Sequence, residues 1–320
     1  MHSYHFSIVI PSYERGAQLA ACLESLTHLD YPRDCFEVIV VDDGSRTPLS
    51  DGVARFRAEL NLTLLRQANA GPATARNRGA MEAKGKFLAF TDDDCTPAHD
   101  WLRALADRFA AVPESMIGGR SINALPENLY TTTSQLMTDA VYEYYNHDSS
   151  RQHFFTSNNL AMPGEMFRAV GGFDMTFPLP ASEDREFCER WLNQGNLMTY
   201  APEVVVLHSH ELSCSGFFKH YFNYGRGALH FHGVRARAGK ERLKPDPKFY
   251  RNLFTYPFRH LNGGRALLME IMLVLAYVAY TGGFLWQKLR HRATVGFKSR
   301  LDRSEGSPVS DPSVKASKGE

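Results

Sequence analysis

The amino-acid sequence predicts an α/β fold of the Rossmann-like kind, with a mostly parallel central sheet covered by helices on both faces. Two observations carry this prediction. Over the first hundred residues, short apolar runs alternate with amphipathic stretches, which is typical of strand–helix–strand units. Acidic and polar motifs directly follow three of the apolar runs, at the position where parallel sheets bind ligands.

The expected elements follow one another at regular spacing. The strands are short, apolar and bounded by Pro, Asp, Gly or Thr, and they are Phe6–Ile10, Phe36–Val41, Leu62–Arg66 and Phe87–Thr91. The helices between them are Gln18–Thr27, Val53–Leu60 and Pro72–Lys84, the last with proline in its first turn. From Met116 to about Tyr224 the pattern is less regular, and we expect this part to complete the site.

Three motifs are expected to meet in one crevice. The segment Pro11-Ser12-Tyr13-Glu14 follows the first strand, Asp42-Asp43-Gly44-Ser45 the second, and Asp92-Asp93-Asp94 the fourth. Adjacent carboxylates repel one another unless a cation or hydrogen-bond donors compensate them. Oxygen ligands of this kind suit Mg²⁺ or Mn²⁺ shared with phosphates, whereas the alternative is an Asp-rich turn that caps a helix beginning near Trp101.

A phosphate-binding helix start is expected after the third strand. The stretch Gly71-Pro72-Ala73-Thr74-Ala75-Arg76-Asn77-Arg78-Gly79 opens a helix, and a helix N-terminus favours anions. Arg76 and Arg78 add donors suited to phosphate or carboxylate partners. Glycine-led helix starts are common, and the stretch is no GxGxxG, so a dinucleotide oxidoreductase lacks its usual signature.

Two later features have alternatives that spacing leaves open. The segment Ser182-Glu183-Asp184-Arg185-Glu186 begins an amphipathic helix, and its acids either cap that helix or supply a general base. Val204–Leu207 reads as a strand that delivers His208, with His210 on the same face. These histidines either complete a metal site or hydrogen-bond in the core.

Composition places the chain on the cytosolic side of a membrane. The cysteines, Cys22, Cys35, Cys95, Cys188 and Cys214, form no CxxC pair, and Met1 to Phe6 does not resemble a signal peptide. Net charge is +1, but Lys219 to Arg265 holds eleven Lys or Arg against Glu241 and Asp246. This basic segment is locally +9, so the remainder sums to −8 (+1 minus +9), and an anionic neighbour is expected for it.

A membrane-associating region is expected at residues 231–292. The run from Ile271 to Trp286 is uncharged and strongly apolar, but short for a spanning helix, which needs about 20 residues. Basic residues follow it, and Tyr280 and Trp286 suit a membrane interface, so we favour an interfacial or embedded helix over a core helix. Residues 293–320, rich in Ser, Pro, Lys and Gly from Ser304 onward, are expected to be a disordered tail.

In order, these residues resemble the family 2 glycosyltransferases, inverting enzymes with the GT-A fold. The matching segments cover about Phe6 to Ala228, and they are Ser7–Tyr13, Val40–Ser45, Gly71–Gly79, Phe90–Asp94, Gly171–Asp174, Glu183-Asp184 and Tyr224–Gly227. The resemblance implies a GT-A domain over residues 1–230. Its first half, 1–115, would bind a nucleotide sugar and its second half, 116–230, an acceptor.

The resemblance also implies residue roles. Tyr13 and Asp43 would contact the nucleobase, with Pro11 and Glu14 lining that pocket, and Gly71, Arg76 and Asn77 would lie near the donor. Asp92-Asp93-Asp94 is similar to the family's DxD motif, with Asp92 and Asp93 nearest the ribose and the metal. Asp94 and a late histidine, His208 or less securely His210, would be the metal ligands. Glu183 would lie at the substrate, and Asp184 would be the base.

The implied reaction is a single inverting displacement. Asp184 would deprotonate the acceptor hydroxyl, while Mn²⁺ or Mg²⁺ and Arg76 would stabilise the departing nucleoside diphosphate. A UDP-sugar is the donor most expected, and the acceptor would be a saccharide or a lipid-linked molecule. Arg190-Trp191 follows Phe187 rather than Gln, so the QxxRW motif of processive synthases is missing and a non-processive enzyme is expected.

Three competing hypotheses remain. A non-catalytic sensor or scaffold would be expected to lack the base or the metal ligand, yet Asp94 and Asp184 are both present. A nucleotide-sugar pyrophosphorylase would have a glycine- and lysine-rich loop after its first strand, and this chain does not. The aromatics near Phe217 could stack nucleic-acid bases, but they suit a membrane or core helix better, so no nucleic acid is expected.

Overall fold

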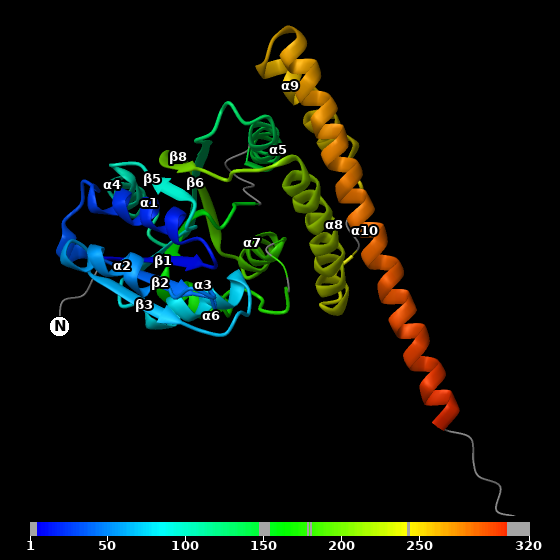
Figure 1. The fold of residues 1–320 in the computed structure, drawn as a ribbon, viewed down its shortest axis with the longest axis horizontal. Coiled ribbons are helices and arrows are strands. Elements are labelled where there is room, and N and C mark those ends of the chain that lie inside the picture. The colour runs from blue at the N-terminus through cyan, green and yellow to red at the C-terminus, as the bar shows by residue number, and fades with distance from the viewer. Residues whose placement is uncertain (1–4, 147–153, 178, 180, 242–243, 306–320) are drawn as a thin grey trace, which may run out of the picture.

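An eight-stranded sheet organises the computed structural model, which describes residues 5–146, 154–177, 179, 181–241 and 244–305. The strand order is β3-β2-β1-β4-β7-β6-β8-β5. Strands β1, β2, β3, β4, β6 and β8 run parallel, and β7 and β5 run antiparallel to their neighbours. The predicted mostly parallel sheet is therefore confirmed (Figure 1).

The strands are β1 Phe6–Ser12, β2 Phe36–Asp42, β3 Leu62–Arg66, β4 Phe87–Thr91, β5 Cys95–Pro97, β6 Ser115–Asn123, β7 Asn159–Pro163 and β8 Leu197–His208. The first helices are α1 Gly16–Thr27, α2 Ser50–Ala54, α3 Pro72–Glu82, α4 Trp101–Ala111 and α5 Leu129–Asn146. The later helices are α6 Gly164–Val170, α7 Glu183–Asn193, α8 Cys214–Arg237, α9 Pro247–His260 and α10 Gly263–Glu305.

The predicted strands and helices of the first hundred residues are present, with one break. The stretch predicted as a single helix, Val53–Leu60, is instead the end of α2 followed by a 3₁₀ turn at Arg55–Ala58. The short strand expected at Val204–Leu207 is the end of the longer β8, which pairs with both β6 and β5. That pairing was not predictable from local pattern because its partners are distant in sequence.

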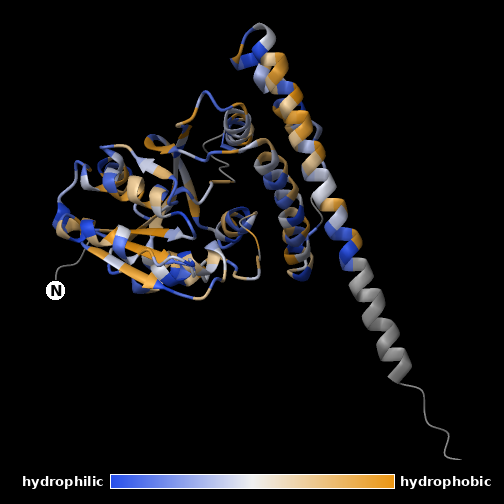
Figure 2. Cartoon of the chain, viewed as in Figure 1, coloured by the Kyte–Doolittle hydropathy of each residue, from blue (hydrophilic) through white to orange (hydrophobic). Residues whose placement is uncertain are grey.

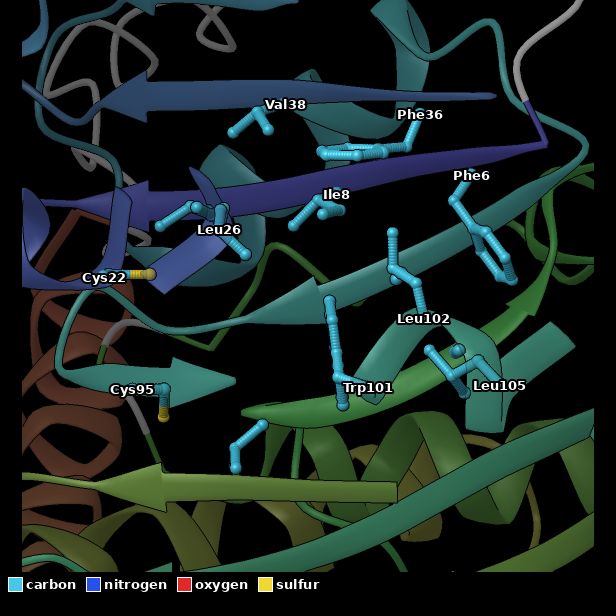
Figure 3. Packing of buried hydrophobic residues seen from close by; sticks show 14 of the residues in the cluster. Phe6, Ile8, Cys22, Leu26, Phe36, Val38, Cys95, Trp101, Leu102 and Leu105 are labelled. Atoms are coloured by element: carbon cyan, nitrogen blue, oxygen red, sulfur yellow. The ribbon is translucent and has the colours of Figure 1, made fainter. Parts of the chain in front are cut away.

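Both faces of the sheet are covered, and the sequence of β1 shows why. Every residue of β1 is buried, and its alternating side chains serve two hydrophobic cores. Ile8 points into a cluster with Leu26, Trp101 and Leu102, which Figure 3 shows at close range. Val9 joins the opposite cluster, and the apolar strands stand out in Figure 2. The sheet is therefore a rigid base for the loops at its strand ends.

Helix α10 crosses α8 at very close range, because both helices carry glycine at the contact. A Cβ atom on Gly225 would lie 1.8 Å from the carbonyl oxygen of Tyr280, and one on Gly283 would lie 1.9 Å from that of Phe222. On the same stretch of α8, a Cβ on Gly227 would lie 2.6 Å from the Cβ of Ala181. Helix α8 is thus packed closely between α10 and the segment that leads into α7.

Helix α10 corrects the expected start of the disordered tail. It continues without interruption to Glu305, so residues 293–305 are helical rather than disordered. The remaining expected tail, residues 306–320, lies outside the described residues. Gly263–His291 is long and apolar enough to cross a membrane by length and composition, and it exceeds the expected run of Ile271 to Trp286.

Neighbouring glycines on α10 test the close crossing. We expect Gly283→Ala to lower the free energy of unfolding by about 1–3 kcal/mol, because α8 and α10 must move apart to admit the methyl group. Gly282→Ala is the matched control, since nothing lies within 4 Å of its Cβ position. That control should be neutral or stabilising by about 0.5–1 kcal/mol, because alanine favours helix. Equal urea midpoints for the two variants would contradict the crossing.

Candidate active site

A cavity of about 1120 Å³ lies between the strand ends and the C-terminal helices. Asp92 and Asp94 from the end of β4 lie in one part of its wall, and Glu183 and Asp184 from the start of α7 lie in another. Tyr277 and Tyr280 of α10 contribute to the same wall. The cavity therefore joins the acidic strand end, the candidate base and the C-terminal helices.

Arg76 connects the acidic motif to α7. Its Nη2 lies 2.7 Å from Asp92 Oδ1, and its Nη1 lies 3.2 Å from Glu183 Oε1. Burial alone would lower the pKa of Arg76, but the charges of Asp92 and Glu183 raise it above its ordinary value. The guanidinium therefore remains charged, and it fixes the start of α7 against the end of β4.

Asp93 faces the end of β1 rather than the cavity. Its Oδ2 accepts a hydrogen bond from Ser12 Oγ at 2.7 Å, and its Oδ1 lies 3.2 Å from Arg15 Nη1. Burial raises the pKa of Asp93 to about 6, although Arg15 and the Ser12 hydroxyl oppose this rise. Arg15 also donates to Asp94 Oδ2 at 2.7 Å, so this one arginine holds both aspartates.

Asp94 lies between two histidines. His208 Nε2 is 3.2 Å from Asp94 Oδ1, and His210 Nδ1 is 3.2 Å from Oδ2. Burial alone would raise the pKa of Asp94, but the two imidazoles and Arg15 outweigh it and hold that pKa well below its ordinary value. Oδ1 is buried and accepts no hydrogen bond from any residue that the structure describes.

This donor set suits a divalent cation. Among the described residues, ligand atoms of Asp94, Cys95 and His208 lie within 4.8 Å of one another. Cys95 belongs to the hydrophobic core, and burial raises the pKa of its thiol well above the ordinary value, so it is a poor ligand for a hard ion. The carboxylate Oδ1 of Asp94 and the imidazole Nε2 of His208 are left as the pair with free coordinating capacity.

Asp184 is the second residue of α7, two positions after Ser182, whose φ of 72° is left-handed. Its Oδ1 accepts the backbone N–H of Arg185 at 2.8 Å. Burial raises the pKa of Asp184 to about 7, and the neighbouring charge of Glu183 adds to the rise. A carboxyl group with this pKa can accept a proton near neutral pH.

The residues expected at the nucleobase, which are Pro11, Tyr13, Glu14 and Asp43, lie outside this cavity around the ends of β1 and β2. Gly71, which is expected near the donor, also lies outside it, at the turn into α3. Asp43 is buried, and its carboxylate accepts hydrogen bonds from Gln67 Nε2 and from the backbone N–H groups of Ala70 and Gly71. It therefore shapes the loop that begins α3. Tyr13 is 45% exposed and available for stacking.

Asn77 hydrogen-bonds to a residue 96 positions away, a contact that the sequence did not indicate. Its Nδ2 donates to the carbonyl of Phe173 at 2.8 Å, and its Oδ1 accepts the Phe173 N–H at the same distance. Both polar atoms of the side chain are therefore bound to the Gly172-Phe173 loop. Asn77 thereby fastens this loop to α3.

Arg15, His220 and Tyr224 line the cavity close to the acidic and histidine residues, although the sequence did not single them out as site residues. His220 and Tyr224 are one helical turn apart on α8, with ring centroids 4.1 Å apart, and the His220 ring lies 5.3 Å from that of His210. Burial and the nearby histidines lower the pKa of His220 to about 3, so it is neutral. The four-residue spacing of His220 and Tyr224, and the place of Tyr224 in the segment Tyr224–Gly227 that resembles the family, were the available signals.

Sequence comparison decides the family. Residues 7–173, which are 167 of the 320, match the family described as Glycosyl transferase family 2. The chain belongs to glycosyl transferase family 2. It is thus a glycosyltransferase, and the match covers the three strand-end motifs and the turn into α3.

Relatives and solved structures agree with this family. Glycosyltransferase AglE of Haloferax volcanii is 26% identical over 231 residues, 70% of this chain and 72% of that protein. Pre-mycofactocin glycosyltransferase of Mycobacterium tuberculosis is 28% identical over 227 residues, which are 69% of this chain but 46% of that protein. The chain thus spans most of the first relative's length and about half of the second's.

The solved structures show the fold. Mannosyltransferase PcManGT from Pyrobaculum calidifontis, in complex with GDP-Man and Mn²⁺, has a TM-score of 0.57 at 20% identity, covering 93% of this chain and 80% of that one. S. aureus TarS has a TM-score of 0.52 at 16% identity, covering 87% and 54%. The predicted GT-A fold is confirmed.

Proposed function

We propose that this protein transfers a single sugar from a nucleoside-diphosphate sugar to an acceptor hydroxyl, with inversion at the anomeric carbon. The observation that carries the proposal is the shared cavity, which Asp184 and the acidic strand end both line, while Arg76 pairs with Asp92 and with Glu183, the neighbour of Asp184. Solved structures of this fold bind GDP-Man in PcManGT and UDP-GlcNAc in S. aureus TarS. We expect a UDP-sugar as donor.

The transfer is one displacement with a general base. Asp184 takes the proton of the acceptor hydroxyl, the hydroxyl oxygen bonds to the anomeric carbon, and the bond to the diphosphate oxygen breaks. The nucleoside diphosphate leaves with the bonding electrons. One base and one displacement invert the centre, since retention through a covalent intermediate would need a second carboxylate as nucleophile.

Asp94 Oδ1 and His208 Nε2 are the proposed ligands of Mn²⁺ or Mg²⁺. When bound there, the ion would offset the negative charge that develops on the leaving diphosphate. His210 bonds the other carboxylate oxygen of Asp94, so it holds the carboxylate in place. Arg15 shares that role, and Tyr13 and Asp43 lie where the nucleobase would bind.

The basic and apolar C-terminal region supports the proposed location and acceptor. We propose a non-processive enzyme on the cytosolic face of a membrane, peripheral or singly anchored through the C-terminal region, with a saccharide or lipid-linked acceptor. The basic segment Lys219 to Arg265 and the apolar helix α10 support this location. A non-catalytic nucleotide-sugar sensor is the alternative that the following experiment addresses.

A nucleotide-sugar panel tests the proposed chemistry. With Mn²⁺ the purified protein should hydrolyse one donor slowly, and a chelator should abolish this. Asp184→Asn should lower turnover by about 10²–10⁴-fold while donor still binds, because only the base is lost. Asp94→Ala should weaken Mn²⁺ binding, measured by calorimetry, by more than about a hundred-fold. Donor binding without any turnover would favour the sensor or scaffold hypothesis, and the absence of donor binding with Mn²⁺ present would contradict the proposed site.

The raised pKa of Asp184 predicts the pH dependence. The base must be deprotonated, so kcat/KM should fall as the pH drops below about 7. Glu183→Gln removes a neighbouring negative charge, which should lower the pKa of Asp184 and move this acid limb to lower pH.

Glu189→Gln on the same helix is the control for that shift, because Glu189 pairs with Arg235 and Lys240. The control should leave the acid limb in place. An acid limb that does not move in Glu183→Gln would assign the titration to another group.

A further inference from the structure

Helix α10 has two apolar faces, and only one of them is covered by protein. The inner face, with Met269, Met272, Leu273 and Ala276 buried, packs against α5, α8 and α9. Large apolar side chains on the opposite face are exposed from Leu267 to Leu289, and Figure 2 colours much of this part of the helix as hydrophobic. We call it the outer stripe, and it consists of Leu267, Leu268, Ile271, Val274, Leu275, Val278, Leu285, Trp286 and Leu289.

The charges around the outer stripe are almost all positive. Arg265 is exposed before its first residue, and Lys288, Arg290 and His291 are exposed at its end. Between Gly263 and His291 the single acidic residue is Glu270. A second copy of this chain packed on the stripe, parallel or antiparallel, would bring these basic ends together without acidic partners. A lipid bilayer with anionic head groups matches the stripe better, because it offers an apolar interior to the stripe and negative charge to its basic ends.

Packing against α8 decides how α10 can meet a bilayer. Helix α8 is joined to α10 at the Gly225 and Gly283 crossing, and it carries His220, Arg226 and Arg235 among other polar residues. If α10 crossed the membrane, α8 would have to enter the hydrocarbon with those side chains, at high cost. A helix that lies in the plane of the interface exposes only its outer stripe to lipid.

We propose that the outer stripe of α10 docks on an anionic bilayer surface, with the helix axis parallel to the membrane plane. This rests on the membrane association proposed above but not on the transfer chemistry. Trp286 lies at the edge of the outer stripe, where it contacts Phe222 and Arg226 of α8 and Arg290 of α10, and a tryptophan in this setting suits the level of the head groups. Because Tyr277 and Tyr280 on the inner side of α10 line the cavity, the docked helix places the cavity of Asp184 at the bilayer surface.

Vesicle flotation tests the surface. The wild-type protein should float with vesicles of phosphatidylglycerol and phosphatidylcholine, more weakly with phosphatidylcholine alone, and less in high salt. The double variant Val278→Glu, Leu285→Glu should lose vesicle binding by about ten-fold or more, because two side chains that are 62% and 50% exposed would carry charge into lipid. Met81→Glu, at an 80% exposed site on α3, is the control and should bind as the wild type.

The same samples separate this proposal from the proposed function. Hydrolysis of the nucleotide sugar in solution should persist in the double variant, since the outer stripe does not line the cavity. Loss of vesicle binding with hydrolysis intact supports the docking face. Wild-type vesicle binding that is absent, or unchanged in the double variant, overturns it. A dimer that becomes monomeric in the double variant, without vesicle binding, assigns the stripe to a second copy.

Depth measurement tests the orientation. Spin labels at Leu267→Cys, Val278→Cys and Leu289→Cys span about 33 Å along the helix. They are placed in a Cys35→Ser, Cys214→Ser background, because the other cysteines are buried. Similar shallow depths for all three labels support an in-plane helix. A central label deep in the hydrocarbon, with the outer two at opposite surfaces, would show a spanning helix and overturn the proposal.

Discussion

The buried guanidinium of Arg76 is the constraint on which the rest of the site depends. A charge taken out of water is tolerated only where opposite charges and hydrogen bonds replace the lost solvent. Arg76 finds them in Asp92, at the end of β4, and in Glu183, at the start of α7. Helix α3, the end of β4 and the start of α7 must therefore meet at one point, and the strand-end motif and the proposed base adjoin as a result.

Around this ion triad the carboxylates differ in their environments. The pKa of Asp94 is held low by its histidines and Arg15, and that of Asp184 is raised by burial and by Glu183. Carboxylates whose pKa values differ in this way can serve different roles at the same pH, one as a permanently charged ligand and one as a proton acceptor. The division suits the proposed transfer chemistry.

The sequence predicted those parts of the molecule that depend on local pattern. The parallel strands, the motifs at their ends and the acid pair before Phe187 could be located because apolar periodicity and strand ends are local features. The two-way bond of Asn77 with Phe173 could not, since it joins residues 96 apart. The contacts of Arg15 and His220 depend likewise on how the chain returns to Asp94. The exposed stripe of α10 could not be predicted either, because it is defined by the packing of α8 against the other face of the helix.

The Tyr224–Gly227 segment shows how the C-terminal helices are tied to the site. Gly225 admits α10 and Gly227 admits Ala181, so one short stretch of α8 contacts both the outermost helix and the chain before Asp184. Tyr224 itself lines the cavity beside His220. Small residues at these two positions are required by backbone proximity, and they place the aromatic wall of the cavity.

The most direct measurement is a crystal structure of the protein with Mn²⁺ and UDP. We predict the ion on Asp94 Oδ1 and His208 Nε2, with the diphosphate beside it. Arg76 should still bridge Asp92 and Glu183, and Asp184 should remain accessible from the cavity. Diphosphate bound away from Asp94, or an Arg76 that leaves Glu183 and separates α7 from the end of β4, would contradict it.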